Sequence, residues 1–297
     1  MIKQKNKIIS IVGASGFLGK HLYHHLTLKM SDNYNVIGTF FSNNNPSTLD
    51  KLDITNYIEV EKYLLTYTPD YIILTAGTKN VQLCEENYEY AFTLNTKPVE
   101  TFVQIIEKHQ LQIKFIFFST DYVFDGEVGN YNENEISSPK TNYGKTNSLS
   151  EQFLLNSSID YKIIRTSAVM GKGGIFWDWF LLKMRKKEKT EIFTNVFFTP
   201  TSRIFLSDII ENVISEYESI SNNILHVVGE IKFSRYEFCK LTCNLIGVDD
   251  SFIIPVNADL NNLTFQKDLS LIQSDYVKHK NKFNFKYYLL KEYKEVL

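Results

Sequence analysis

Short apolar runs that alternate with helical stretches constrain the fold of this chain most. The runs are rich in β-branched or aromatic residues and lie at 7–12, 35–41, 70–77, 114–121 and 160–167. Stretches with helical apolar spacing separate them, and this alternation is typical of βαβ units. The runs are almost continuously apolar, as expected for parallel strands covered by helices on both faces. The sequence therefore predicts an α/β fold with a Rossmann-type, doubly wound parallel sheet.

The last third of the sequence is less regular than the first two. FSRYEFCKLTCNLIG (233–247) has the pattern of a helix entered through Ser234. We predict a nucleotide-binding Rossmann domain over 1–167, to which a later segment at about 196–230 returns. Most of 168–297 is predicted to form a smaller C-terminal substrate lobe.

Composition and charge argue against several classes of protein. The chain has 297 residues and a formal net charge of -2, which disfavours a general binder of nucleic acid or of an acidic membrane surface. No apolar stretch approaches the roughly 18–20 residues that a membrane span needs. Three cysteines without metal-ligand spacing fit a reduced, cytoplasmic protein, and no metal site is predicted.

The turn after the first predicted strand has the pattern G-x-x-G-x-x-G. Glycines let the main chain turn tightly and approach a dinucleotide pyrophosphate, whose charge is stabilised at the N-terminus of the following helix. The position between a strand and a helix is the context that this motif requires. Cofactor contacts are expected at Gly13, Ser15, Gly16, Phe17 and Leu18, with Gly19 completing the pattern.

Further cofactor residues are predicted at other strand ends, where a doubly wound sheet binds its ligands. Asp53, followed by Ile54, is placed to hydrogen-bond the adenine. Thr75, Ala76 and Gly77 end the third strand with side chains small enough for a cofactor to lie against the backbone. Asn95 lies in a helix predicted over 88–110, where it is either an exposed polar residue or a buried one with partners.

The end of the second predicted strand bears on the choice between NAD and NADP. It reads GTFFSNNN and offers no acidic residue for the two hydroxyls of an adenosine ribose. It has no arginine either, so Ser42 and Asn43 would serve as neutral donors to a 2′-phosphate. The sequence therefore favours NADP(H) over NAD(H).

The most specific motif is STDYVFDG (119–126), which ends the fourth predicted strand and is followed by NYGKT (142–146). These two segments resemble the extended short-chain dehydrogenase/reductases. Seven further segments share the resemblance: GASGFLG, LDIT, PDYIILTAGT, IIRTSAVMG, FTPTSRIFLSDII, HVVGEIKFSRYEFCKL and QKDLSLIQSD. Within that group the chain is most similar to the dTDP-4-dehydrorhamnose reductase family. The resemblance covers essentially the whole chain, in order.

The resemblance implies a reductase of deoxysugar and surface polysaccharide biosynthesis. A nicotinamide cofactor would give hydride to the 4-keto carbon of a nucleotide-linked 6-deoxyhexose. By motif, Tyr143 is the proton donor, Thr120 the polarising hydroxyl, and Asp121 and Tyr122 lie beside the sugar. The implied partner is a nucleotide-diphosphate sugar. The family includes homodimers and members that use Mg²⁺, although no ligand set for a metal stands out here.

The first departure from the family pattern is Asn147, which stands where the family has a lysine. That lysine bonds the nicotinamide ribose and lowers the pKa of the family's tyrosine; a cation lowers such a value by roughly 1–3 units. Asn147 can still bond ribose hydroxyls but carries no charge. Lys145 is about 200° around a helix from Tyr143 and should face elsewhere. We expect a proton step slower by about ten- to thousandfold, with reduction affected less than oxidation.

The second departure is Ala168, which follows RTS where the family commonly has a large aromatic residue facing the sugar. Trp177 and Trp179 could fill the space, although packing in the core or lobe is the commoner role for such residues. The sugar therefore need not be the rhamnose precursor. Candidate contacts to the sugar or diphosphate, each with a structural role as the alternative, are Tyr131, Arg203 and Arg235.

Two alternatives to a reductase stay open. Asn147 and Ala168 also fit a protein that keeps the NADP-binding cleft without the chemistry, as in the regulatory subunit of methionine adenosyltransferase. A related epimerase or dehydratase is the other alternative. Dehydratases usually have Asp-Glu after the threonine, whereas here Asp121 is followed by Tyr122, which disfavours that activity.

Overall fold

The computed structural model describes residues 6–42, 47–261 and 266–296, which form two compact units. The described parts of Met1–Ser119, Thr141–Ile164 and Val213–Ile224 make up the first unit. The second unit contains Thr120–Lys140, Arg165–Asn212 and the described part of Leu225–Leu297. The later segment of the first unit is Val213–Ile224, and the predicted division into a domain over 1–167 with a return at about 196–230 stays a prediction.

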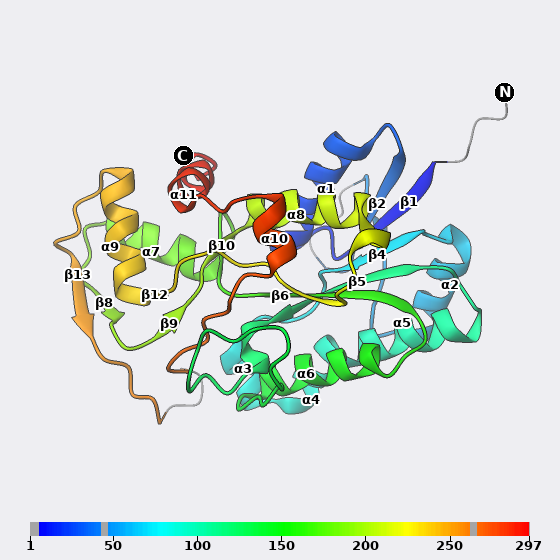
Figure 1. Cartoon of the computed structure of the whole chain (residues 1–297), viewed down its shortest axis with the longest axis horizontal. Helices are drawn as coiled ribbons and strands as arrows, with labels where there is room; N and C mark the ends of the chain where they lie inside the picture. The colour runs from blue at the N-terminus through cyan, green and yellow to red at the C-terminus, as the bar shows by residue number, and fades with distance from the viewer. Residues whose placement is uncertain (1–5, 43–46, 262–265, 297) are drawn as a thin grey trace. The chain divides into compact units, whose positions relative to one another are not determined.

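Seven strands of the described residues form one sheet in the order β11-β6-β5-β4-β1-β2-β3 (Figure 1). Strand β1 pairs in parallel with β2 and β4, and β4 pairs in parallel with β5. The strand order reverses between β1 and β4, which is the switch point where doubly wound sheets bind ligands. The predicted Rossmann-type α/β fold is confirmed. The strands are β1 Lys7–Val12, β2 Tyr34–Phe40, β3 Asp50–Lys51, β4 Tyr71–Leu74, β5 Lys114–Thr120, β6 Asp160–Thr166 and β11 Ile224–His226.

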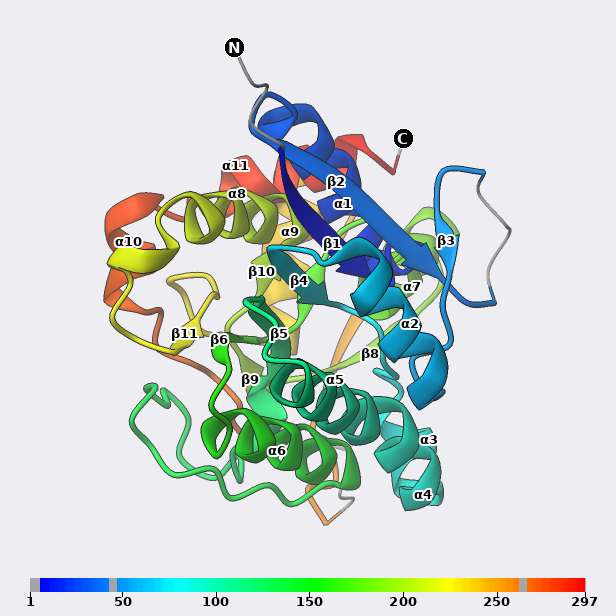
Figure 2. The same ribbon diagram turned by 90° about the vertical axis from the view of Figure 1, so that its right-hand side faces the viewer.

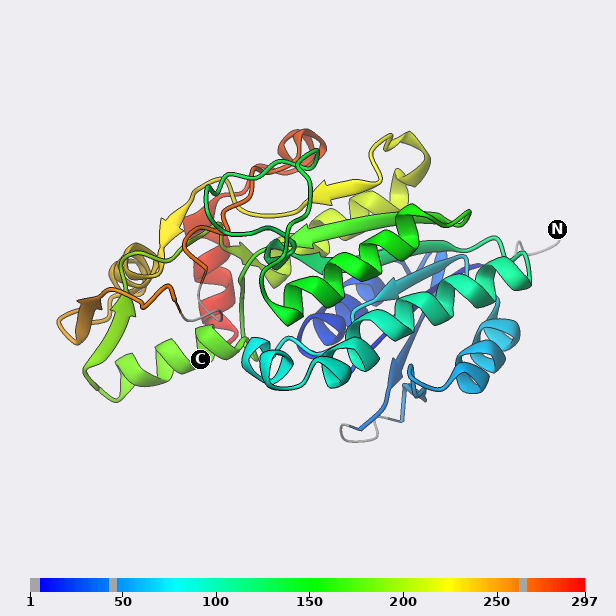
Figure 3. The same cartoon turned by 90° about the horizontal axis from the view of Figure 1, so that it is seen from below.

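Helices cover both faces of this sheet. Figure 2 shows α2, α5 and α6 side by side over one face and α1 over the other, and Figure 3 shows α5 and α6 from below. Side-chain caps fix four of the starts listed below; Asn56, for example, accepts from the backbone of Ile58 and Glu59, and Thr141 accepts from that of Gly144. The helices are α1 Phe17–Met30, α2 Tyr57–Tyr67, α3 Val81–Glu86, α4 Tyr88–Ala91, α5 Lys97–Lys108 and α6 Asn142–Leu155. Short 3₁₀ turns occupy Asp121–Val123 and Tyr217–Ser219.

The single helix predicted over 88–110 is wrong in one respect. Between α4 and α5 the chain makes a π-helical turn over Phe92–Thr96. A π turn adds one residue to a helical turn and leaves some backbone groups without their usual partners. Here the carbonyl of Asn95 accepts a hydrogen bond of 3.0 Å from Ser150 Oγ of α6. A side chain remote in sequence therefore bonds the backbone of the π turn.

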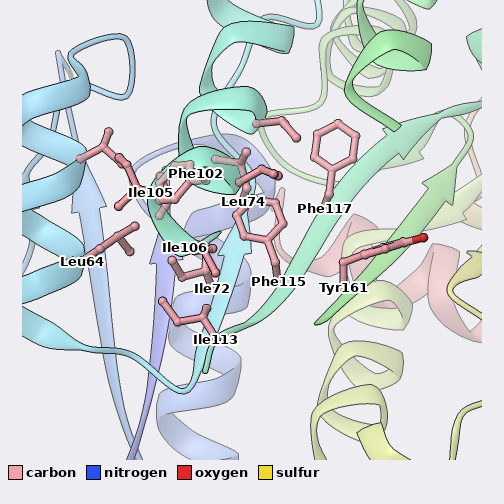
Figure 4. Close-up of a cluster of buried hydrophobic side chains, with 14 of the residues drawn as sticks. Leu64, Ile72, Leu74, Phe102, Ile105, Ile106, Ile113, Phe115, Phe117 and Tyr161 are labelled. Carbon is pink, nitrogen blue, oxygen red and sulfur yellow. The ribbon is translucent and has the colours of Figure 1, made fainter. Parts of the chain in front are cut away.

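The largest apolar core of the first unit lies between the sheet and the α2–α5 face. Figure 4 shows Leu64 of α2 and Phe102 of α5 among side chains from β4 and β5. Phe102 and Phe115 are fully buried, with ring centroids 5.5 Å apart. Removing either ring would cost about 3–5 kcal/mol by the usual penalty for a large core truncation. This core anchors the strands whose ends carry the predicted site residues.

The second unit is built around short strands of two to four residues. Strand β8 pairs in parallel with β13, β7 with β10, and β9 pairs antiparallel with β12. The helix predicted at 233–247 is α9, and a capping box between Ser234 and Glu237 starts it as expected. Figure 1 shows α9 near α7 and the β8–β13 pair. The elements are β7 Val169–Met170, β8 Thr190–Phe193, β9 Phe197–Phe198, β10 Thr201–Ser202, β12 Phe233–Ser234, β13 Ile253–Val256, α7 Ile175–Arg185, α8 Arg203–Ser215, α9 Arg235–Ile246, α10 Asp275–Lys280 and α11 Phe285–Lys294.

Candidate functional site

The glycine turn forms a tight cradle between β1 and α1. Gly13 has a φ of +93°, and a Cβ atom there would lie 2.8 Å from the backbone nitrogen of Ala76. A Cβ at Gly19 would lie 2.2 Å from the carbonyl oxygen of Gly13 and 2.6 Å from Thr75 Oγ1. Helix α1 starts without a side-chain cap or an acidic residue in its first turn. The first amides of α1 can therefore receive an anion such as a pyrophosphate.

The segment after β4 lies directly against this cradle. Thr75 Oγ1 donates to the carbonyl of Val12 at 3.0 Å, and the backbone nitrogens of Thr75 and Ala76 bond the same oxygen. After these bonds to the carbonyl of Val12, the chain leaves the sheet, and strand β4 ends at Leu74. The apolar run had predicted a strand that ends three residues later, at Gly77. This close approach requires small side chains at Thr75 and Ala76, and the cofactor contact predicted for them stays a prediction.

Asn95 is buried, with only 7% of its surface exposed. Its side-chain oxygen accepts from the backbone nitrogen of Thr78 at 2.8 Å, and its amide nitrogen lies 3.5 Å from Thr146 Oγ1 of α6. A Cβ at Gly77 would lie 2.9 Å from the same Asn95 oxygen. The structure thus decides against the exposed alternative. Asn95 fixes the loop after β4, and a direct cofactor contact for it stays a prediction.

The loop after β4 carries a cation that the sequence analysis did not select. The exposed Lys79 holds its Nζ 4.2 Å from the ring centroid of Phe17, the first residue of α1. The loop is fixed on both sides of Lys79, by the Asn95 bond to Thr78 and by Asn80, which caps α3. A lysine two residues after the predicted third strand (70–77), at the ligand-binding edge of the sheet, was the available signal.

The remaining predicted cofactor residues of the first unit lie in its turns, except Phe17 and Leu18, which begin α1. Asp53 Oδ1 accepts from the backbone and hydroxyl of Thr55, at 2.9 and 2.7 Å, and so forms a local turn. Ser42 is exposed just after β2, and Asn43 lies outside the described residues. Half-buried positions are Ser15, Phe17, Leu18 and Ile54.

The N-terminus of α6 presents Tyr143. Thr141 caps the helix, and the backbone of Asn142 donates to Glu85 Oε1 at 2.5 Å, so the Cys84–Glu85 segment of α3 holds this turn. Tyr143 is half-buried. The Asn147 amide nitrogen donates to the carbonyl of Tyr143 at 2.8 Å, and Asn147 is only 5% exposed. Asn147 is thus bonded back to its own helix one turn below Tyr143, while Lys145 is exposed, as its helical position predicted.

The end of β5 leads into the second unit with a buried polar cluster. Thr120 Oγ1 accepts from the backbone of Tyr122 at 3.2 Å and donates to Asp121 Oδ1 at 3.0 Å. Ser167 Oγ donates to Asp121 Oδ2 at 2.6 Å. Ser167 was missed in the sequence, although it lies in the RTS motif. A ligand carbonyl would compete with Asp121 for the hydroxyl hydrogen of Thr120.

Burial shifts the pKa of both side chains that follow Thr120. Loss of water raises the pKa of Asp121 to about 6, against the opposing effect of the Ser167 and Thr120 hydrogen bonds. Burial and the neighbouring Asp121 charge raise the pKa of Tyr122 to about 12. Tyr122 therefore stays neutral at physiological pH, and Asp121 changes charge within the range in which many enzymes work.

Arg203, a predicted substrate residue, is held inside the second unit. Its Nη2 atom lies 2.8 Å from Glu292 Oε2 and 2.6 Å from Glu295 Oε2 of α11, and its Nη1 atom donates to the carbonyl of Lys172 at 2.9 Å. Glu292 is fully buried. These contacts give Arg203 a structural role between β10 and α11, and a substrate contact for it stays a prediction.

Tyr131 and the residues around Ala168 also have defined partners. The Tyr131 hydroxyl donates to Asp125 at 2.5 Å and accepts two backbone bonds, so it organises the loop after β5. Ala168 is half-buried, and its carbonyl accepts from Thr201 at 3.1 Å. Trp177 is 1% exposed and belongs to the core of the second unit, whereas Trp179 is 39% exposed.

Other features of the described residues do not coincide with the predicted site. A surface groove of about 780 Å³ follows α9 and is lined by Lys232, Tyr236 and Lys240 among others, but by none of the predicted site residues. The described residues contain no cluster of histidine, cysteine and acidic side chains that could hold a metal ion. None of the helices in the described ranges has the length and apolar character of a membrane span.

Comparison with known proteins finds similarity to a polysaccharide biosynthesis protein, a sugar-nucleotide reductase and a methionine adenosyltransferase subunit. The chain is 27% identical over 258 residues to the spore coat polysaccharide biosynthesis protein SpsK of Bacillus subtilis, covering 86% of this chain and 85% of that protein. It is 29% identical over 235 residues to a dTDP-4-dehydrorhamnose reductase of Aggregatibacter actinomycetemcomitans, covering 77% and 75%. It is 27% identical over 161 residues to methionine adenosyltransferase 2 subunit beta of Xenopus tropicalis, covering 54% and 46%.

Solved structures give the same fold over nearly the whole chain. A dTDP-4-dehydrorhamnose reductase of Clostridium acetobutylicum superposes with a TM-score of 0.84 at 25% identity, covering 97% of this chain and 99% of that one. A Bacillus anthracis dTDP-4-dehydrorhamnose reductase in complex with NADP also has a TM-score of 0.84, at 23% identity, covering 98% and 99%. The family model described as the RmlD substrate binding domain matches residues 7–282. Because that match runs through the greater part of the chain, the protein belongs to the RmlD substrate-binding domain family.

Proposed function

We propose that this protein is an NAD(P)H-dependent reductase of a nucleotide-linked 4-keto-6-deoxyhexose, acting in deoxysugar or surface polysaccharide biosynthesis. The observation that carries the proposal is the buried cluster of Thr120, Asp121 and Ser167 at the end of β5, in a chain of this family. Named sugar-nucleotide reductases among the relatives support it. The same resemblance suggests a cytoplasmic enzyme, with a homodimer as the assembly to test.

The glycine cradle fits the cofactor that this function requires. Side chains at Gly13 and Gly19 would fill the space against Ala76 and Thr75, and the uncapped start of α1 offers its amides to a pyrophosphate. When bound, the nicotinamide supplies the hydride. The segment after β2 has Ser42 and no acidic residue, which favours NADP(H) over NAD(H). Comparing the Kd values of NADPH and NADH tests that preference.

The chain's own groups would manage the charge that develops on the substrate oxygen. Tyr143 would give a proton to this oxygen, which typically contributes about 10²–10⁴ in rate. The Thr120 hydroxyl would turn from Asp121 to bond the same oxygen, and one such donor is worth about 10²–10³ in kcat. Asn147, bonded to the Tyr143 carbonyl, would contact the cofactor ribose without supplying a charge.

The test is NADPH oxidation with dTDP-, UDP-, GDP- and CDP-linked 4-keto-6-deoxy sugars. We expect turnover with at least one of them and a loss of about 10²-fold or more in Tyr143→Phe. Tyr88→Phe, a change at a partly exposed position of α4, is the matched control and should keep the wild-type rate. No turnover above the Tyr143→Phe level with any of the four sugars would refute the reductase.

A second candidate is an NADP-binding regulatory subunit without activity. The neutral Asn147 favours it, as does the partial similarity to methionine adenosyltransferase 2 subunit beta. This function predicts NADP binding, no turnover, and a larger partner that copurifies from the native source. A measurable native activity that Asn147→Lys increases, with no change in any partner, would contradict it.

A further inference from the structure

Arg235, the first residue of α9, is held between aromatic rings. Its guanidinium carbon lies 3.9 Å from the ring centroid of Phe198 and 4.8 Å from that of Phe176. Cation–π contacts of this kind fix the plane and position of a guanidinium, but they use none of its five N–H donors. The rings therefore position the charge without satisfying its N–H donors.

The two N–H donors of Arg235 Nη1 have no acceptor among the described residues. Nη1 of Arg235 is buried and makes no hydrogen bond within the part of the chain that the structure describes. Leaving a buried donor unsatisfied is costly, and it is costlier for a charged group. Buried polar atoms of native proteins almost always have partners, so an exception calls for a functional or ligand-based explanation. We take the bare Nη1 as the position of a ligand acceptor.

The charges around Arg235 indicate what the acceptor is. Asp121 and Tyr122 act on the guanidinium electrostatically and oppose the lowering of its pKa by burial. No ion pair within 4.0 Å joins Arg235 to Asp121 among the described residues, so the two charges are near each other but not in contact. Each oxygen of Asp121 already accepts one hydrogen bond and keeps capacity for another.

A hydroxyl group complements this pair better than an anion does. Arginine can only donate, and a carboxylate can only accept, so a group placed between them must both accept and donate. A sugar hydroxyl does both. A phosphate oxygen would accept from Arg235 but would be repelled by the Asp121 charge.

Building on the proposed function, we propose that Arg235 and Asp121 together bind one hydroxyl of the substrate's sugar ring. The hydroxyl oxygen accepts from Arg235 Nη1, and its hydrogen goes to Asp121. Arg235 is thereby a determinant of sugar specificity. It recognises the hexose through a hydroxyl and makes no contact with the nucleotide or the diphosphate.

The experiment compares nucleotide with nucleotide sugar by calorimetry. The pairs are dTDP and dTDP-rhamnose, UDP and UDP-glucose, GDP and GDP-fucose, and CDP and CDP-glucose, in the presence of NADP. In Arg235→Met, which keeps the length and apolar packing of the side chain, the best-bound nucleotide sugar should bind about 10- to 100-fold more weakly, as expected for a lost charged hydrogen bond. The free nucleotide should bind as in wild type. Lys240→Met, on the exposed face of the same helix, is the matched control and should change neither affinity.

Thermal unfolding without ligand separates recognition from a structural role. Because Arg235→Met removes an unsatisfied buried donor, its Tm should equal or exceed that of the wild type. A much lower Tm with unchanged sugar affinity would make Arg235 structural and overturn the proposal. Equal losses for nucleotide and nucleotide sugar would place the contact on the diphosphate and overturn it as well. If the wild type binds none of the four nucleotide sugars, the proposed function itself fails.

Discussion

The surrounding chain provides hydrogen-bond partners for the guanidinium of one arginine of the second unit, Arg203, but leaves the buried Nη1 atom of another, Arg235, without one in the described residues. Arg203 has Glu292, Glu295 and the Lys172 carbonyl as partners, all within 3.1 Å of its nitrogens. Arg235 lies between two phenylalanine rings, and its Nη1 atom has no acceptor in the described chain. A charge whose partners come from the chain stabilises the fold, whereas a charge left without them is available to a ligand. The choice of residue type does not distinguish the two, but the completeness of hydrogen bonding does.

The strongest test of this comparison is Arg203→Met. The change leaves the fully buried Glu292 without its counter-ion, and breaking a buried pair in this way costs about 3–5 kcal/mol. Urea unfolding at neutral pH should show that loss in the free energy of unfolding. Arg185→Met, at the exposed end of α7, is the matched control and should stay within about 0.5 kcal/mol of wild type. Equal stability of the two variants would remove the structural role of Arg203.

The pH dependence of the free energy of unfolding tests Asp121, the carboxylate that acts electrostatically on Arg235. The pKa of Asp121 is raised from 3.8 to about 6 in the folded protein, so the folded state binds the proton more tightly than the unfolded state. The contribution of Asp121 is fully present below pH 3.8 and is lost as pH rises to about 6, a change on the order of 3 kcal/mol. The slope should be missing in Asp121→Asn and retained in Asp275→Asn, an exposed control on α10. A slope unchanged by Asp121→Asn would place the titration elsewhere.

Asn147→Lys extends the comparison to a cation introduced into the first unit. The new side chain would lie one turn below Tyr143 and stabilise the phenolate needed for sugar oxidation. We expect oxidation to become faster by about tenfold or more, with a smaller gain in reduction. The measurement is kcat in both directions, with the exposed Lys145→Asn as control. Rates unchanged in both directions would show that the missing charge does not limit the proton step.

Lys79→Gln probes an exposed charge that lies over the ring of Phe17 at the start of α1. Because Lys79 lies over Phe17 at the start of α1, its positive charge should attract the cofactor phosphates. Salt should partly screen this attraction, since the lysine is exposed to solvent. NADPH should bind about three- to tenfold more weakly, with the loss decreasing at high salt, and the free energy of unfolding should change by less than about 0.5 kcal/mol. Fluorescence titration at two ionic strengths measures the effect. A loss of affinity independent of salt would argue against an electrostatic role.

Local sequence determined what the sequence analysis could predict. The glycine turn, the Ser234 start of α9 and the alternation of strands and helices depend on neighbouring residues, and the structure confirms them. The exposed position of Lys145 follows from helix geometry alone. Each of these features involves residues only a few positions apart, so propensity and periodicity are sufficient to find it.

Long-range partners determined what could not be predicted. Asn95 is buried because its partners Thr78 and Thr146 lie 17 and 51 positions away. Arg203 becomes structural only through Glu292, 89 positions later in a helix that the sequence pattern did not reveal. The bare Nη1 of Arg235 is likewise invisible in the sequence, because it depends on the acceptors that the folded chain does not provide.

The π turn at Phe92–Thr96 has a consequence for how this family can tolerate insertions and deletions. One residue corresponds to about 100° of rotation along an α-helix, so the extra residue sets the angular phase between α4 and α5. Deleting a single residue here would turn Tyr88–Ala91 to a different side of the helix axis and detach the Asn95 carbonyl from Ser150. The number of residues in the segment Phe92–Thr96 is therefore as strictly specified as their identity. A relative with a longer or shorter segment at this position must hold its loop after β4 by other contacts.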